Sequence, residues 1–213
     1  LAAQLAEELP EGSLRLRESA ESVTPRSVKL ASGESLNASA VVVAATPLTT
    51  RRLAGLDDVP PYLPALCWYF EAEEAPVDRG ILVLAGDDSG PVTNLAVMSQ
   101  VSDRYAPPGR HLVSATVLGE RSPTPELLEA VQTQMRQWYG PAAETWREIR
   151  AYSIEEALPD QSLRAGGVAP RPIRTGNGLY VCGDHRVHGS IEGAIQSGLA
   201  VADRLAAELD AAG

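Results

Sequence analysis

The chain of 213 residues is 44% hydrophobic, which is enough to bury a sizeable core and excludes a disordered protein. Its 28 acidic residues outnumber 18 basic ones, and no predicted element gathers Lys and Arg on one face, so we expect no nucleic-acid partner. No apolar run exceeds six residues, whereas a membrane span needs roughly 20, and no signal peptide is recognisable. We therefore expect a soluble, cytoplasmic protein without a membrane span.

The first part of the chain predicts a helix, several short strands and one buried strand. Leucines recur every four residues over 1–9, and a proline–glycine stop follows at 10–12. Strands are expected at 13–17, 22–24, 27–30 and 35–37, the last two joined by a turn at 31–34. The apolar run 40–45 is typical of a strand covered on both faces, and Thr46 is expected to cap the helix that begins near Pro47.

A proline-rich stretch at 55–64 is expected to be a crossing between domains, because the sequence after it changes to strands separated by turn residues. Strands separated by turn residues are expected at 66–72, 81–85, 92–99, 111–118 and 146–158, and they predict an antiparallel sheet. A helix ending near Tyr139 carries an apolar stripe of Leu127, Leu128, Val131, Met135 and Trp138. A loop at 159–178 forms the return crossing, before a strand at 179–182 and a helix at 190–209.

These elements predict a mixed α/β (α+β) fold. Residues 1–58 and 166–213 form one domain, and residues 59–165 form a second domain with an antiparallel sheet and a helix. Within that sheet, Trp68 and Phe70 share one face, Tyr69 lies on the other, and Ile149 is expected to share a face with Ala151 and Ser153. Core packing is the expected role of the aromatic run, with the wall of an apolar substrate pocket as the alternative.

Cysteine spacing indicates neither a disulfide nor a metal site. Cys67 and Cys182 lie far apart without a CxxC pattern, so both are expected to be free and buried. No metal is expected.

The segment most informative about function runs from 178 to 198. A buried strand ends at Gly183, Asp184 follows at once, and a short loop leads to a helix start that contains Gly193. Amides at a helix start suit an anion or an electron-rich oxygen, and a carboxylate at the end of a strand can accept hydrogen bonds from hydroxyls. From the residues alone, an ordinary strand–loop–helix with a capping aspartate remains the alternative.

Two of the three histidines, His185 and His188, fall in this loop. They are weak candidates for an acid or base, or for binding an acidic substrate. Solvated or capping histidines are the alternative, and a metal site is not expected because a third ligand is missing.

The same segment resembles a known family. Gly183-Asp184, Gly189-Ser190-Ile191-Glu192-Gly193-Ala194 and Ser197-Gly198 resemble, in order and spacing, the C-terminal flavin motif of FAD-dependent oxidoreductases. That group contains the amine oxidases, protoporphyrinogen oxidases and phytoene desaturases, and residues 1–47 with Pro159 extend the similarity over nearly the whole chain. The resemblance implies that 1–58 and 166–213 belong to a Rossmann-like FAD-binding domain and that 59–165 is the substrate-binding domain.

The resemblance also implies residue roles. Asp184, next to Gly183, would bind the ribityl or pyrophosphate part of FAD. Ile191 and Glu192, following Ser190, would offer backbone amides to the pyrimidine end of the flavin. Val23 would meet the adenine through its backbone.

Departures from the family pattern narrow the subgroup. Ser190 stands where amine oxidases commonly carry an aromatic cage residue, and the single lysine, Lys29, lies in the predicted hairpin rather than near the flavin motif. Oxidation of simple amines is therefore not expected, and the motif is closer to the desaturases and protoporphyrinogen oxidases. No cysteine resembles a covalent flavin attachment point, so FAD would be bound non-covalently.

The chain lacks a Gly-x-Gly-x-x-Gly turn, and it starts with Leu1 instead of Met. We therefore expect a fragment of a longer enzyme that transfers hydride from an apolar or amphipathic small molecule to FAD. The fragment alone would be inactive and free of FAD, and it would self-associate through the apolar face left on 40–45 and on the last helix. The alternative is a stand-alone, non-catalytic module that binds a ligand or a partner.

Overall fold

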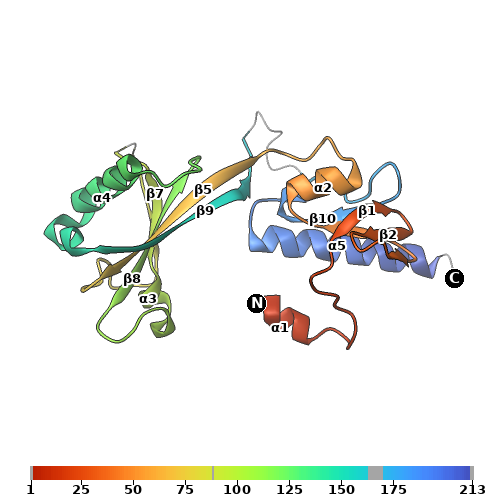
Figure 1. The fold of residues 1–213 in the computed structure, drawn as a ribbon, viewed down its shortest axis with the longest axis horizontal. Helices are drawn as coiled ribbons and strands as arrows, with labels where there is room; N and C mark the ends of the chain where they lie inside the picture. The colour runs from red at the N-terminus through yellow and green to blue at the C-terminus, as the bar shows by residue number, and fades with distance from the viewer. Residues whose placement is uncertain (1, 88, 163–169, 212–213) are drawn as a thin grey trace. The chain divides into compact units, whose positions relative to one another are not determined.

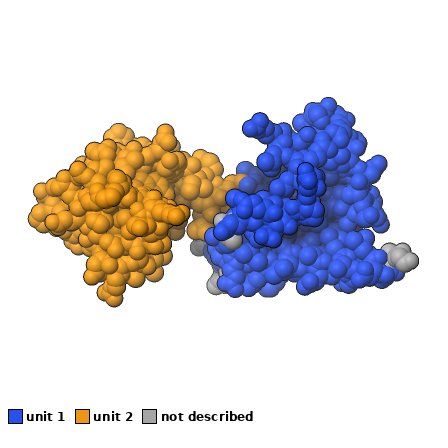
Figure 2. All heavy atoms as spheres, turned by 90° about the horizontal axis from the view of Figure 1, so that it is seen from below, with its two compact units in different colours: residues 1–60, 161–213 blue, residues 61–160 orange. Residues whose placement is uncertain are grey.

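The computed structural model describes residues 2–87, 89–162 and 170–211. The chain forms two compact units, shown in Figure 2: unit 1 is residues 1–60 with 161–213, and unit 2 is residues 61–160. The first crossing falls within the proline-rich stretch 55–64, whereas the boundary expected at 165/166 lies outside the described residues.

Unit 1 contains a small antiparallel sheet, a parallel pair of strands and, among its described residues, three α-helices. The sheet has the order β1-β2-β3, with β1 at Ala20–Thr24, β2 at Ser27–Leu30 and β3 at Ser35–Asn37. β4 (Val42–Ala44) pairs in parallel with β10 (Tyr180–Cys182). The helices are α1 (Ala2–Glu7), α2 (Pro47–Ala54) and α5 (Ile191–Asp210), and a 3₁₀ turn, η4, covers Asp184–Arg186 (Figure 1).

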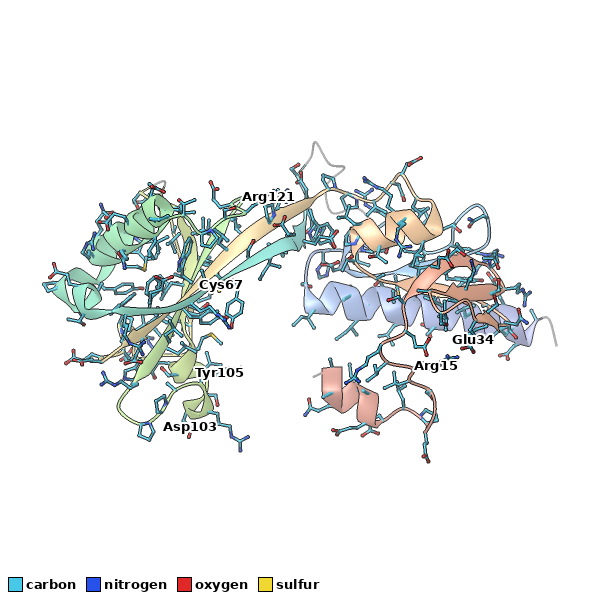
Figure 3. The ribbon with its side chains drawn as sticks, viewed as in Figure 1. Arg15, Glu34, Cys67, Asp103, Tyr105 and Arg121 are labelled. Atoms are coloured by element: carbon cyan, nitrogen blue, oxygen red, sulfur yellow. The ribbon has the colours of Figure 1, made fainter. Side chains whose placement is uncertain are left out.

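The strand expected at 13–17 is not formed. Leu14 and Leu16, whose alternation predicted it, are 50% and 77% exposed, so neither gains the burial that favours a strand. Arg17 has a φ of 61°, which is incompatible with an extended chain. Arg15 instead bridges to Glu18 and Glu34, and Figure 3 shows Arg15 close to Glu34.

The apolar run 40–45 is covered on one face within the described structure, which differs from a strand covered on both faces and agrees with the open apolar face expected on this segment. Val41 and Val43 are buried, whereas Val42 is 39% exposed. The strand also spans only residues 42–44. Thr46 occupies the N-cap position of α2 as predicted, but its hydroxyl bonds to the Thr49 hydroxyl and not to a backbone amide.

Unit 2 is built on the expected antiparallel sheet, with strand order β6-β7-β8-β5-β9. The strands are β5 (Tyr62–Ala72), β6 (Leu82–Leu84), β7 (Val92–Val97), β8 (His111–Leu118) and β9 (Arg147–Pro159). The helices are α3 (Met98–Val101) and α4 (Pro125–Tyr139), with 3₁₀ turns η1 (Asp103–Tyr105) and η2 (Gly140–Thr145). β7 ends before Ser99 because α3 begins at Met98.

One face of this sheet forms the core of unit 2 against α4. Trp68 and Phe70 are 0% and 1% exposed in that core, and the apolar stripe of α4 packs there through Val131 and Met135. The predicted alternation of the aromatic run is therefore confirmed. No described helix of the chain is long and apolar enough to cross a bilayer.

A β-bulge changes which residues of β9 share a face. Tyr69 pairs with Arg150, but the next residue, Phe70, pairs with Glu148. The irregularity places Ile149 beside a hollow with Arg150, whereas Ala151 packs against the core. The expectation that Ile149 and Ala151 share a face is wrong for this reason.

A buried glutamine of α4 holds the start of β7. The side-chain Oε1 of Gln134, 1% exposed, accepts from the Val92 amide at 2.7 Å, and its Nε2 donates to the Val92 carbonyl at 3.1 Å. Gln134→Ala leaves both backbone groups without a protein partner, so we expect a loss of about 2 kcal/mol in the free energy of unfolding, measured by urea denaturation. Gln137→Ala, at an exposed position of the same helix, should change it by less than about 0.5 kcal/mol. Equal effects of the two substitutions would contradict this role.

Candidate functional site

β10 is the buried strand that leads into the candidate site. Val181 packs in the cluster formed with Val43 of β4, while Tyr180 and Cys182 pack on the other side with Val201 of α5. Coverage on both faces, which the sequence predicted for 40–45, therefore belongs to β10. This burial fixes the point at which the chain leaves the strand.

Gly183 ends the strand with a backbone conformation that favours glycine. Its φ is 145° and its ψ is 166°. A Cβ at this position would lie 2.6 Å from Cε1 of His185, and the Gly183 amide donates to Ser197 Oγ of α5 at 2.8 Å. The turn is thus held to the helix that follows.

The start of α5 is capped by Ser190 and packed closely against the loop. Ser190 Oγ accepts from the Gly193 amide at 2.9 Å and lies 2.9 Å from Nδ1 of His188. A Cβ on Gly193 would come within 3.0 Å of the His188 carbonyl oxygen, closer than Cβ atoms are found. The predicted close approach at Gly193 is therefore made by the loop backbone itself.

Two amides at this helix start take no part in the capping bonds. Gly193 N bonds to Ser190 Oγ and Ala194 N bonds to the Ser190 carbonyl, but no hydrogen bond from the described part of the chain reaches the amides of Ile191 or Glu192. The Ile191 side chain is 70% exposed. These amides carry the partial positive charge of a helix N-terminus and can bind an electron-rich oxygen.

His185 is buried within the turn η4. Its side chain is 1% exposed, both ring nitrogens lack a hydrogen-bond partner, and Nδ1 is 3.8 Å from Asp184 Oδ1. That distance is too long for a hydrogen bond. Across residues 2–87, 89–162 and 170–211, no group of three potential metal ligands occurs.

Arg186 is a residue of the site that the sequence analysis missed. Its side chain is 1% exposed, donates to both carboxylate oxygens of Asp58 at 3.3 Å and also bonds to the Pro172 carbonyl. Arg171 donates to the Asp58 carbonyl at 2.8 Å. These bonds hold the segment around Asp58 to the segment at 171–172 and to the turn at Arg186. No spacing in the sequence relates Asp58 to Arg186, so no signal in the sequence could have paired them.

The structure places the predicted site residues in two groups. Gly183, Asp184, His185, His188, Ser190, Ile191 and Glu192 lie in one continuous turn and helix start. Val23 lies apart in β1, where it pairs with Val28 and packs against the cluster of Val41, Val43 and Val181. All of them belong to unit 1.

The first group suits the polar end of a flavin nucleotide. Two open amides and a partly exposed carboxylate at Asp184 form a surface that an electron-rich ring and hydroxyls can approach. The buried, unpartnered His185 nitrogens add polar atoms below it. The residues present therefore fit FAD.

The sequence matches the family model described as flavin containing amine oxidoreductase over residues 1–206. No curated protein matches it at a significant level.

Solved structures share the fold. Cyclohexylamine oxidase from Brevibacterium oxydans is similar with a TM-score of 0.61 and 19% identity, over 91% of this chain and 48% of that one. An oxidoreductase from Methanosarcina mazei is similar with a TM-score of 0.58 and 14% identity, over 84% of this chain and 46% of that one. Reduced UDP-galactopyranose mutase is similar with a TM-score of 0.58 and 15% identity, over 74% of this chain and 39% of that one. The chain thus spans less than half the length of each.

Proposed function

The chain belongs to the flavin-containing amine oxidoreductases, and we propose that it acts within a longer enzyme that transfers hydride from an apolar or amphipathic small molecule to non-covalently bound FAD. The observation that carries this proposal is the helix start of α5, where the open amides of Ile191 and Glu192 lie directly after Asp184 and its loop. The nucleotide-binding turn would come from another part of the longer chain.

FAD, when bound, supplies the redox chemistry, and this chain's residues hold and tune it. The carboxylate of Asp184 would bind the ribityl or pyrophosphate part of FAD, accepting hydrogen bonds from hydroxyls there. The amides of Ile191 and Glu192 would stabilise negative charge at the pyrimidine end of the ring, because the first turn of a helix favours an anion. The backbone of Val23 would contact the adenine.

The cap of α5 supports a substrate other than a simple amine. Ser190 uses its hydroxyl to hold the Gly193 amide and to meet His188, and it offers no aromatic wall. His188 thereby acts as a capping partner, which was the alternative to a catalytic role. His185 and His188 are not assigned a proton-transfer step.

Substitution of Asp184 tests the proposed cofactor site. In the longer natural chain, Asp184→Ala should weaken FAD binding about ten- to a hundredfold, because hydrogen bonds to a charged acceptor contribute about 1.5 to 3 kcal/mol. Flavin absorbance after dialysis against known FAD concentrations measures the binding. Asp203→Ala, at an exposed position of α5, is the matched control and should leave it unchanged.

Two results would contradict the proposal. A colourless longer chain would favour the stand-alone binding module, and equal flavin occupancy in the Asp184→Ala variant and the control would place the cofactor elsewhere. The 213-residue chain alone is expected to be colourless. Its self-association and its cytoplasmic location stay predictions.

A further inference from the structure

The face of the unit 2 sheet opposite α4 contains a hollow of about 830 Å³. Cys67 and Tyr69 of β5 and Leu112 of β8 line one side, and residues of β9 between 149 and 154 line the other. Figure 3 shows Cys67 midway along the sheet. The volume lies in the range of clefts that bind small molecules, and the hollow lies entirely within unit 2.

Apolar and aromatic side chains form most of the wall. Ile149 and Ile154 are 49% and 45% exposed on the rim, although both are large and apolar. The Tyr69 and Tyr152 rings meet edge to face, with centroids 5.8 Å apart and an interplanar angle of 87°. Such exposure around a concave surface indicates that an apolar body covers it.

One positive charge lies in this wall without a carboxylate partner. The Arg150 guanidinium lies 5.5 Å from the centre of the Tyr152 ring, and no ion pair to Arg150 occurs among the described residues. Glu71 lies on β5 two residues after Tyr69, which pairs with Arg150. Its carboxylate already forms ion pairs with Arg147 and Arg110. No acidic residue lines the hollow. Stacking on the ring leaves the N–H edge of the guanidinium free for a planar, two-oxygen acceptor.

The polar groups beside Arg150 add no negative charge. Burial, and next the neighbouring Cys67 thiol, raise the pKa of Tyr69 above its ordinary value of 10. The phenol therefore keeps its proton at neutral pH. The Cys67 Sγ lies 3.1 Å from Ser114 Oγ, so the thiol is engaged within the sheet.

We infer that this hollow binds an apolar small molecule that carries one carboxylate. The carboxylate pairs with Arg150, and the apolar body lies against Tyr69, Ile149 and Ile154. The identification of this molecule as the substrate rests on the proposed function. The binding itself needs no flavin, so the two can fail separately.

Three probes that share one ring system test the charge preference on the 213-residue chain. They are 2-naphthylacetate, its neutral amide 2-naphthylacetamide and the cation 2-(2-naphthyl)ethylamine, with dissociation constants measured by calorimetry. We expect the acid to bind about tenfold more tightly than the amide, and the amine to bind most weakly. Arg150→Gln should remove the preference for the acid, leaving acid and amide within about twofold.

Matched variants separate charge from shape. Arg104→Gln removes the same charge from an exposed residue of unit 2 outside the hollow, for which no ion pair occurs among the described residues, and should leave all three affinities unchanged. Ile149→Ala should weaken acid and amide equally, about threefold to tenfold, because it removes only apolar contact. Circular dichroism of each variant confirms that the sheet is folded.

The inference is overturned if no probe binds with a dissociation constant below about 1 mM. It is also overturned if the amine binds as well as the acid, or if Arg150→Gln and Arg104→Gln act alike. Arg150-dependent binding of the acid in a protein whose longer form carries no flavin would support the inference while contradicting the proposed function.

Discussion

Replacing Gly193 by alanine is expected to disrupt the helix start that carries the proposed flavin contacts. The added Cβ would come within 3.0 Å of the His188 carbonyl oxygen, which is backbone and cannot move aside as a flexible side chain could. We expect a loss of about 3 kcal/mol in the free energy of unfolding, because the loop at 188–190 must shift and the Ser190 cap is strained. Urea denaturation of the 213-residue chain measures it.

Gly198 provides the matched control on the same helix. An added Cβ there meets no atom within 4 Å, and alanine favours a helix interior over glycine by about 1 kcal/mol. Gly198→Ala should therefore leave the chain equally stable or more stable. In the longer chain, Gly193→Ala should also lower flavin occupancy. Retained stability in the Gly193→Ala variant would show that the loop relaxes freely and does not depend on this close approach.

Removing the carboxylate of Asp58 should destabilise unit 1 by about 3 kcal/mol. Arg186 is 1% exposed, so its charge would be left buried with only the Pro172 carbonyl as acceptor. This loss of about 3 kcal/mol is at the low end for a broken buried ion pair. The reason is that the Asp58 side chain is 44% exposed, so water can partly replace the missing carboxylate. Chemical denaturation of Asp58→Ala gives the measurement.

Two further variants separate the ion pair from a general effect of the loop. Asp57→Ala, one residue earlier and exposed, should change stability by less than about 0.5 kcal/mol. In an Arg186→Met background, Asp58→Ala should cost much less than in the natural chain, because the buried charge is gone. If the losses of stability from Asp58→Ala and Arg186→Met simply add in the double variant, the two residues do not act as a pair.

Elements with strong local signals were predicted closely. β2, β3 and β8 have the predicted bounds, since alternating side chains are delimited there by turn residues. The helix was predicted to start near Ser190, and the structure shows Ser190 as its N-cap, with the hydroxyl accepting from the Gly193 amide. Trp68 and Phe70 lie in the core for the same reason of alternation.

Features that depend on distant contacts were not predictable. Leu14 and Leu16 alternate as a strand would, but no neighbouring strand lies there to pair with them within the described residues. The bulge opposite Phe70 moves Ile149 to the other face, and a single strand's sequence does not encode its partner's register. The Asp58 to Arg186 pair joins residues at opposite ends of the intervening chain. Arg150 and Tyr152 escaped notice because their hollow arises only when β5, β8 and β9 pair.

The hydrogen bonds and the ion pair among Asp58, Arg171 and Arg186 have a consequence for how this chain can evolve. Unit 1 holds the two segments that lead into and out of unit 2 together through Asp58, Arg171 and Arg186. Unit 2 independently closes its own two ends, where Tyr62 pairs with Pro159 and the Asp160 amide donates to the Pro61 carbonyl. The two ends of unit 2 are held together within unit 2, and the two segments of unit 1 that connect to them are held together within unit 1. For the folding of unit 1, the inserted unit therefore costs only the closure entropy of a short loop. Unit 2 can therefore accumulate substitutions, or be exchanged for another sheet with a different hollow, while unit 1 keeps its fold.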